Sequence, residues 1–153
     1  MVSNIYIDSI MKKIKGYQGT FSSNSAPKLK NNQSAILNFS KYGEEGTHFI
    51  AIYIKKNICL YFDPLCINLS FIPKEIKNQL KKYDKIENIS RKIQNNSSDF
   101  CGFFCMLILI SLTFSKKYLF FVLSNFKKDD LNNDKICIKL LTVSIKKYFN
   151  YGK

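Results

Sequence analysis

Two neighbouring apolar segments constrain the fold of this chain most strongly. Residues 48–54 and 58–63 are almost continuous runs of aliphatic and aromatic side chains, and Lys55, Lys56 and Asn57 separate them. Short runs of this kind on either side of a polar turn predict a β-hairpin. Because a strand with one wet face alternates apolar and polar residues, continuous runs indicate strands buried on both faces. The hairpin therefore predicts a central sheet with helices above and below it.

A third apolar run, residues 100–114, predicts a buried helix that starts near Cys101. It is shorter than the roughly 20 residues that a membrane span requires, and Lys116 and Lys117 close it. We therefore expect a core helix and no membrane association. Ser98 or Asp99 is expected to cap this helix, because each carries a side-chain oxygen suited to the free amides of a first turn.

The rest of the chain completes an α+β pattern. Hydrophobic spacing and turn residues predict helices over residues 4–15, 74–83, 117–124 and 131–148, a loop over 19–33, a strand over 35–38 and an extended piece over 86–93. With 153 residues and 46% hydrophobic content, the chain is long enough for one core and too short for two ordinary domains. A single domain spanning residues 1–153 is expected.

The charge balance is strongly basic, with 24 Lys and Arg residues against 11 Asp and Glu residues and a formal net charge of +13. Arg91 is the only arginine. Lysine meets phosphates as a point charge and lacks the bidentate fork that reads guanine edges. Any DNA binding is therefore expected to be independent of sequence and sensitive to salt. The alternative is that scattered lysines only keep the protein soluble.

The five cysteines are odd in number and follow no repeated spacing, which favours a reduced, intracellular setting. Cys101 and Cys105 form a CxxxC pair that Cys59, Cys66 or His48 could complete as a metal site. Structural zinc sites usually show paired short spacings, so we expect no metal and no cofactor. Buried apolar roles are expected for Cys59, Cys105 and Cys137, and partial exposure for Cys66.

The hairpin brings the single histidine towards an acid. If Lys55 and Lys56 form the tip, counting back along both strands places His48 directly opposite Asp63. Opposed side chains have Cβ atoms about 4.5–5.5 Å apart, close enough for a carboxylate to hold an imidazole. The plainer alternative is that Asp63, before Pro64, only punctuates the end of a strand.

Cys101 could be a nucleophile at the start of its helix, where the partial positive charge and a nearby His48 would favour the thiolate. Gln94 could direct its amide towards the oxyanion of a tetrahedral intermediate, together with the backbone N–H of Cys101. Gly102 would let a substrate backbone approach. Each residue alone is more often an ordinary core or surface residue. Together, the order His48, Asp63, Gln94, Cys101 supplies a base, an orienting acid, an oxyanion donor and a nucleophile, which indicates a cysteine protease.

These segments resemble a known family. Residues 46–52, 61–65 and 94–105 are similar to adenain, the maturation protease of adenoviruses, and to its relatives in Polintons and adintoviruses. The SUMO-deconjugating proteases are more distantly similar. Residues 19–23, residues 35–38 and the pair Asn133 and Asp134 also resemble the viral branch. The likeness spans most of the chain, and Gln94 with Cys101 and Gly102 is its most specific part.

The resemblance implies a papain-like or adenain-like cysteine protease fold, with a mixed central sheet packed against the helix that carries the nucleophile. It implies a His48, Asp63 and Cys101 triad with Gln94 in the oxyanion hole. Members of the family cleave after glycine in a narrow tunnel and process virion precursor polypeptides. DNA can be a non-covalent activator in this family, and a monomer in the host nucleus or the virion is expected.

Two departures from the family pattern bear on these expectations. Phe49 stands where the family usually has Trp, so the tunnel wall is expected to lose area and an indole donor. Cys66 is the only cysteine between Asp63 and Gln94 and lies close behind the acid. A peptide activator tethered by a disulfide is therefore not expected.

Two alternatives to a viral endopeptidase remain open from the sequence. The first is a deconjugase that releases ubiquitin-like proteins at their C-terminal glycine. The second is a basic DNA-associated or capsid-associated protein in which the triad is degenerate. A triad is established by geometry, with the sulfur and an imidazole nitrogen within hydrogen-bond reach.

Overall fold

A computed structural model describes residues 1–151 of the chain, as five helices and one five-stranded sheet. The helices are α1 (Asn4–Met11), α2 (Lys74–Leu80), α3 (Cys101–Phe114), α4 (Lys116–Ser124) and α5 (Asn132–Tyr151). The strands are β1 (Tyr17–Phe21), β2 (Ser34–Asn38), β3 (Phe49–Lys55), β4 (Ile58–Phe62) and β5 (Lys85–Asn88). The expected α+β class with a mixed sheet is confirmed.

The strands lie side by side in chain order, β1-β2-β3-β4-β5. β3 is antiparallel to both of its neighbours, β2 and β4, whereas β1 is parallel to β2 and β5 is parallel to β4. Of the two outer strands, β5 overlaps the extended piece expected over residues 86–93, whereas β1 was not predicted. β1 lies partly in the segment expected to be a loop, and its pairing with β2 contains an irregularity.

The turn between β3 and β4 differs from the expected one. Lys56 and Asn57 form the tip, both with positive φ (50° and 58°), as a type I′ hairpin turn requires. Ile54 therefore pairs with Cys59 and not with Asn57. The expected register was wrong by two positions. Because side chains alternate with a period of two, each residue still lies on the face of the sheet that the sequence predicted.

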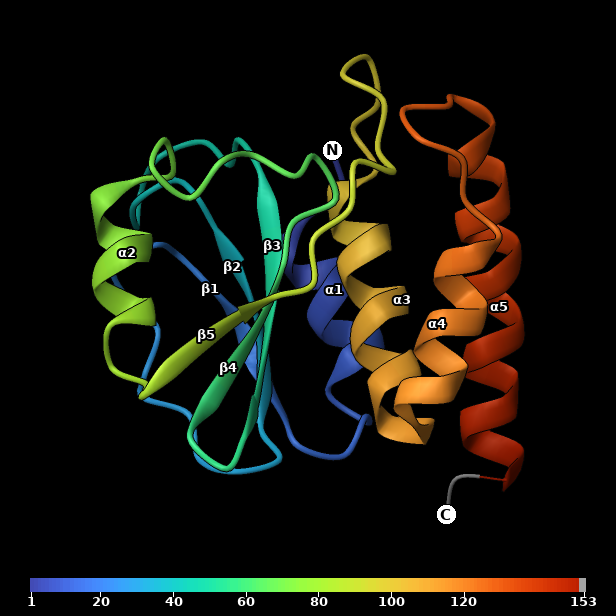
Figure 1. Cartoon of the computed structure of the whole chain (residues 1–153), viewed down its shortest axis with the longest axis horizontal. Helices are drawn as coiled ribbons and strands as arrows, with labels where there is room; N and C mark the ends of the chain where they lie inside the picture. Colours follow the sequence, from blue (N-terminus) through green and yellow to red (C-terminus); the bar gives the residue numbers. More distant parts are fainter. Residues whose placement is uncertain (152–153) are drawn as a thin grey trace.

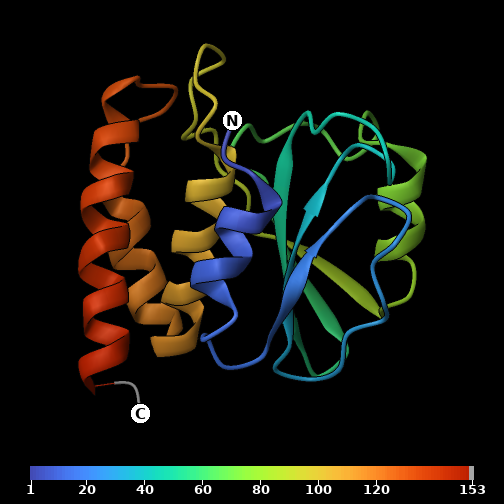
Figure 2. The ribbon, with the colours of Figure 1, turned by 180° about the vertical axis from the view of Figure 1, so that it is seen from behind.

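The sheet lies between two helical layers, as Figures 1 and 2 show from opposite sides. α2 covers one face, over a core that includes Ile52, Ile54 and Tyr61. α1 and α3 cover the other face, and α4 and α5 pack on the far side of α3. The expectation that β3 and β4 are buried from both sides by helices is confirmed.

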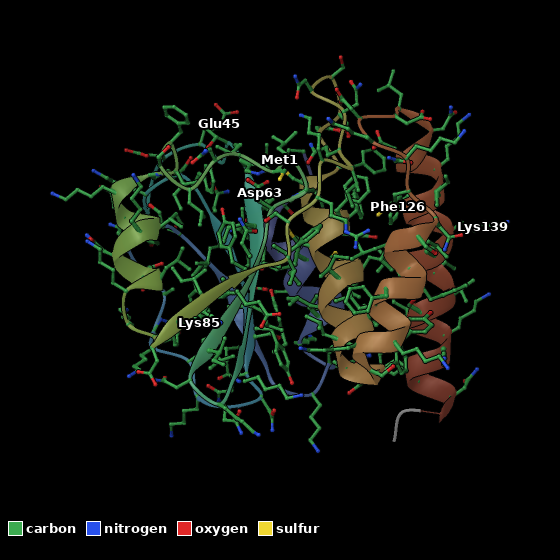
Figure 3. All side chains as sticks on the ribbon, in the orientation of Figure 1. Met1, Glu45, Asp63, Lys85, Phe126 and Lys139 are labelled. Carbon is green, nitrogen blue, oxygen red and sulfur yellow. The ribbon has the colours of Figure 1, made fainter. Side chains whose placement is uncertain are left out.

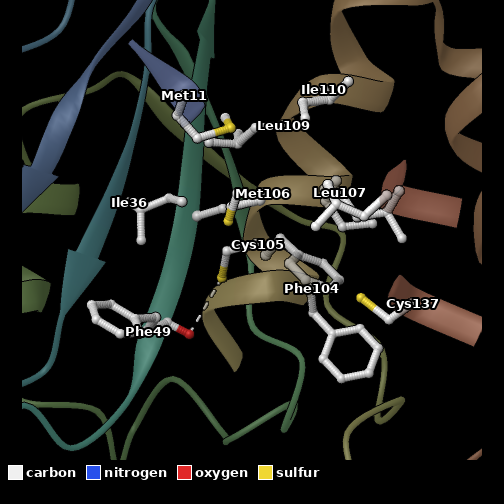
Figure 4. Packing of buried hydrophobic residues seen from close by; sticks show 14 of the residues in the cluster. Met11, Ile36, Phe49, Phe104, Cys105, Met106, Leu107, Leu109, Ile110 and Cys137 are labelled. Carbon is white, nitrogen blue, oxygen red and sulfur yellow. Dashed lines mark hydrogen bonds between the residues drawn. The ribbon is translucent and has the colours of Figure 1, made fainter. Parts of the chain in front are cut away.

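The apolar helix predicted from residues 100–114 is α3. Ten of its fourteen residues are buried, because the sheet covers one side of the helix and α4 and α5 cover another. Figure 4 shows Phe104, Met106 and Leu107 in this core. The Cys105 thiol donates to the carbonyl oxygen of Phe49 at 3.4 Å, which ties α3 to β3. Among the described residues, no helix has both the length and the apolar character needed to cross a membrane.

The glycine that precedes β1 gives a prediction about stability. Gly16 has φ +85°, and a Cβ added there would lie 2.2 Å from the backbone oxygen of Asn32. Gly43 has nearly the same φ, +87°, but a Cβ there would meet no atom within 4 Å. A left-handed conformation costs a residue with a side chain about 1–2 kcal/mol. We expect Gly43→Ala to lose about this much stability and Gly16→Ala to lose clearly more, because the Asn32 carbonyl must also move.

Urea denaturation of the two variants measures the difference. Because the conformational cost is the same at both positions, Gly43→Ala is the matched control for the steric contact. Equal losses of unfolding free energy in the two variants would contradict the close packing of residues 16 and 32.

Candidate active site

His48 and Asp63 meet at one end of the sheet. His48 immediately precedes β3, Asp63 immediately follows β4, and His48 Nε2 lies 2.7 Å from Asp63 Oδ1. Extending the observed register by one residue places Asp63 beside Ile50, so the two side chains are diagonal neighbours and are not directly opposite. Diagonal pairs on one face remain within reach of aromatic and long side chains. The predicted contact is therefore present, although the pairing used to derive it was wrong.

The Asp63 carboxylate is fully buried and held by the turn that follows it. Its Oδ1 accepts the backbone N–H of Leu65 at 2.8 Å, and its Oδ2 accepts that of Ile67 at 3.0 Å. The backbone N–H of Asp63 donates to the Ser90 hydroxyl at 2.8 Å. These bonds fix the direction of the carboxylate, which can then orient the His48 ring.

His48 is 6% exposed and packs edge-on against Phe39, with ring centroids 4.9 Å apart. Burial alone lowers the pKa of His48. Asp63, which is hydrogen-bonded to the ring, and the nearby Cys101 act in the opposite direction, outweigh burial and raise the pKa of His48 to about 9. Because Nε2 is bonded to Asp63, Nδ1 is the ring nitrogen that remains available for a second partner. The ring is therefore held by the acid, with Cys101 close enough to raise its pKa.

Cys101 is the first residue of α3 and is 1% exposed. The helix begins without the cap that the sequence predicted. Phe100 occupies the N-cap position, and no side chain among the described residues caps the helix. Ser98 accepts the N–H of Phe100 at 3.1 Å, and Asp99 pairs with the N-terminal ammonium of Met1 at 2.6 Å. The amides of the first turn therefore keep their partial positive charge beside the sulfur.

Gln94 lies 2% exposed in the segment that leads to α3. Its backbone N–H donates to the carbonyl of Pro64 at 3.0 Å, which joins it to the residue after Asp63. Its side-chain Nε2 donates to the carbonyl of Ser98 at 2.7 Å, and Oε1 has no partner among the described residues. An amide nitrogen carries two hydrogens, so one remains free after the bond to Ser98.

Two expectations about the surroundings of the site were wrong. A Cβ on Gly102 would lie 2.3 Å from Val2 Cγ1 and 3.1 Å from Ile7 Cδ1, so Gly102 allows α1 to approach α3 and does not give a substrate access. Phe49 is 1% exposed and packs in the core against Gly102, so it is not a wall of a tunnel. Both residues hold the base of α3 against its neighbours.

The other four cysteines differ from Cys101 in their surroundings. Cys59, Cys105 and Cys137 are buried, as expected, and burial raises the pKa of Cys59 to about 12 and those of Cys105 and Cys137 well above the ordinary value. Cys66 is exposed. Among the thiols of the described residues, only Cys101 contributes to the raised pKa of His48, the one histidine in the sequence.

The polar residues that hold this site together could not be recognised in the sequence. Ser90 binds the backbone of Asp63, and Ser98 binds the Gln94 amide through its carbonyl. Neither serine stands in a pattern that would indicate such a contact, because both act through loop conformations that depend on distant elements. Figure 3 shows Asp63 at the end of the sheet beside the start of α3, where these loops converge.

No known protein family matches this chain in a scan of family models, and no curated protein matches it in sequence. Within residues 1–151, no three His, Cys, Asp or Glu side chains are grouped so that they could hold a metal ion. The function of the protein is therefore inferred from the chemistry of the site. A thiol, an imidazole that can take its proton and a fixed carboxylate are the groups of nucleophilic acyl transfer.

The raised pKa of His48 gives a prediction that is easily read, because the sequence contains one histidine. We expect the imidazole resonances in an NMR titration to show a midpoint near pH 9 in the native protein. In Asp63→Asn and in Cys101→Ala the midpoint should fall, since each change removes a side chain that raises the pKa of His48 against the effect of burial.

The sign of the matching stability effect follows from linkage. A pKa raised by folding means that the folded protein holds the proton more tightly than the unfolded chain. The stabilisation is present below the ordinary pKa of 6.5 and is lost as the pH rises through about 9. The unfolding free energy of the native protein should fall over this interval more than that of Asp63→Asn. A midpoint near 6.5 in the native protein would refute the pairing.

Proposed function

We propose that this protein is a cysteine endopeptidase in which Cys101 is the nucleophile and His48 the acid and base. The proposal is supported by the sole imidazole, which is bonded to Asp63 at 2.7 Å and whose pKa is also raised by Cys101, the first residue of a buried helix. A thiolate paired with an imidazolium attacks carbonyl carbon at neutral pH more readily than a free thiol.

The proposed reaction has two steps. In the first, the Cys101 sulfur bonds to the scissile carbonyl carbon, and the oxyanion is met by Gln94 and the free amides at the start of α3. His48 then gives its proton to the leaving amine as the C–N bond breaks, leaving a thioester. In the second, His48 takes a proton from water, whose oxygen attacks the thioester; the C–S bond breaks, the acid is released and the Cys101 thiolate is restored beside the protonated His48.

We further propose that the enzyme is an adenain-like maturation protease with a papain-like arrangement, cleaving viral precursor polypeptides after glycine. The order His48, Asp63, Gln94, Cys101 supports this, as does a nucleophile at the start of a helix packed on a mixed sheet. The alternative, a deconjugase, uses the same chemistry on folded ubiquitin-like proteins. A panel of ubiquitin-like conjugates assayed beside short glycine-containing peptides separates the two by their relative kcat/KM.

The central prediction concerns Cys101. We expect Cys101→Ala to lower kcat for a glycine-containing peptide by more than about 10³-fold, because the nucleophile is gone. Cys137→Ala is the matched control: it removes a buried thiol of α5 and should keep activity. Thermal unfolding shows whether each variant is folded. Full activity in a folded Cys101→Ala variant would refute the proposal.

Alkylation separates an active thiolate from a degenerate site. Cys66 is exposed, whereas Cys101 is 1% exposed. Accessibility alone would make iodoacetamide modify Cys66 first. An activated Cys101 should instead react first at pH 7, as mass spectrometry of digested protein would show. Preferential labelling of Cys66, with Cys101 inert, would favour the degenerate basic protein.

A further inference from the structure

The segment between Gln94 and Cys101 depends on neighbouring parts of the protein for its conformation. Residues 95–100 contain no helix or strand, yet the two groups that the reaction requires lie at its two ends. A loop without its own ladder of hydrogen bonds keeps one conformation only if neighbouring elements supply contacts. The contacts come from the start of α5, which lies beside this loop.

Asn133 holds the residue that precedes Gln94. It is fully buried, and its Nδ2 donates to the carbonyl oxygens of Ile93 at 2.8 Å and Lys127 at 2.6 Å. Its Oδ1 accepts the backbone N–H of Lys127 at 3.2 Å. All the polar atoms of its side chain are therefore engaged. The lead-in to Gln94 is anchored to α5 on one side and, through Pro64, to the turn of Asp63 on the other.

Asp134 holds the middle of the loop. Its Oδ1 accepts the hydroxyl of Ser98 at 2.9 Å. The same hydroxyl accepts the backbone N–H of Phe100, the N-cap residue of α3, at 3.1 Å. The carbonyl of Ser98 accepts the side-chain amide of Gln94 at 2.7 Å. Ser98 therefore connects Asp134 both to Gln94 and to the start of the helix that carries Cys101.

We propose that Asp134, acting through Ser98, is a positioning residue that fixes the Gln94 amide relative to the sulfur of Cys101. This inference rests on the proposed cysteine endopeptidase function and extends it to a residue that touches no reacting atom. With Ser98 held, one hydrogen of the Gln94 Nε2 is committed to the Ser98 carbonyl, and the direction of the other follows from the planarity of the amide.

The surroundings of Asp134 support a role beyond helix stabilisation. An acid in the first turn of a helix is ordinarily favourable. Here the side chain is partly buried, and burial together with the charge of Asp99 raises its pKa, while the bond to Ser98 acts in the opposite direction. The carboxylate therefore occupies a position that disfavours its charge, and Ser98 is the partner that offsets this cost.

A donor that acts on the oxyanion stabilises the transition state and not the bound substrate. Loss of one such donor typically costs about 10²–10³ in kcat. In Asp134→Ala the Gln94 amide would be displaced but not removed, so the loss in kcat should be smaller. We therefore expect Asp134→Ala to lower kcat by about 10-fold to 100-fold, with KM nearly unchanged. Asp134→Asn keeps an oxygen that can accept the Ser98 hydroxyl, so its kcat should stay within about threefold of the native value.

Two probes distinguish the oxyanion donor from the thiolate. A peptide aldehyde ending in glycinal forms a hemithioacetal with the nucleophile and places its oxygen where the oxyanion would lie. The rate at which iodoacetamide alkylates Cys101 depends on the activation of the sulfur and not on the oxyanion donor. We expect Asp134→Ala to bind the aldehyde at least about tenfold more weakly while Cys101 is alkylated at the native rate. Lys135→Ala, which changes an exposed charge beside Asp134 on α5, is the control and should match the native protein in both.

Ser98→Ala removes the same hydrogen bond from the loop side and leaves α5 unaltered, so it serves if Asp134→Ala is unfolded. Loss of kcat and aldehyde affinity with native alkylation in either variant, and recovery in Asp134→Asn, supports the proposal. Native kinetics in a folded Asp134→Ala variant overturns it. So does a parallel loss of alkylation, which would indicate general disruption, or an Asp134→Asn variant as impaired as Asp134→Ala.

The experiments distinguish refutation of the positioning role of Asp134 from refutation of the endopeptidase function. If the native protein cleaves glycine-containing peptides and Cys101 is selectively alkylated, but the Asp134 variants behave as the native protein does, the positioning role alone is refuted. If the native protein neither cleaves such peptides nor binds the aldehyde, the endopeptidase proposal is refuted, and the role of Asp134 is refuted with it.

Discussion

The packing of α3 between the sheet and the outer helices is the constraint on which the rest of the structure depends. Ten of the fourteen residues of this helix are buried, and it occupies the centre of the larger core. Gly102 and Phe49 allow close contact at its base, and the bond from Cys105 to Phe49 sets its position against β3. A helix fixed in this way can deliver its first residue to one place only.

That place is the end of the sheet where β3 starts and β4 stops. The strands bring His48 and Asp63 together there, and removing both from water makes their hydrogen bond matter more than it would on a surface. Burial opposes a charged imidazole, whereas the carboxylate and the thiol favour it, and the second effect prevails. The buried pair is balanced only while both partners are present, which links the local electrostatics of the site to the integrity of the fold.

Much of the site could be predicted because its residues occupy positions with strong local patterns. Continuous apolar runs indicated the hairpin and α3, and the single histidine and the acid flank the hairpin. The register was wrong because the tip was assigned to Lys55 and Lys56, although Asn57 readily adopts the left-handed conformation that a type I′ turn requires. Because the register was wrong by two positions, an even number, the predicted and observed registers both place His48 and Asp63 on the same face of the sheet. The contact was therefore anticipated despite an incorrect derivation.

The amino-acid sequence by itself determined the α+β class, the buried strands and helix, and the order of a base, an acid, an amide and a thiol along the chain. These follow from local periodicity and residue chemistry. Only the tertiary structure decided that α3 begins uncapped, that Gly102 serves helix packing, and that Asn133 and Asp134 hold the loop of Gln94. Such contacts join segments 30 or more residues apart. Their partners depend on how the layers stack, which no short stretch of sequence encodes.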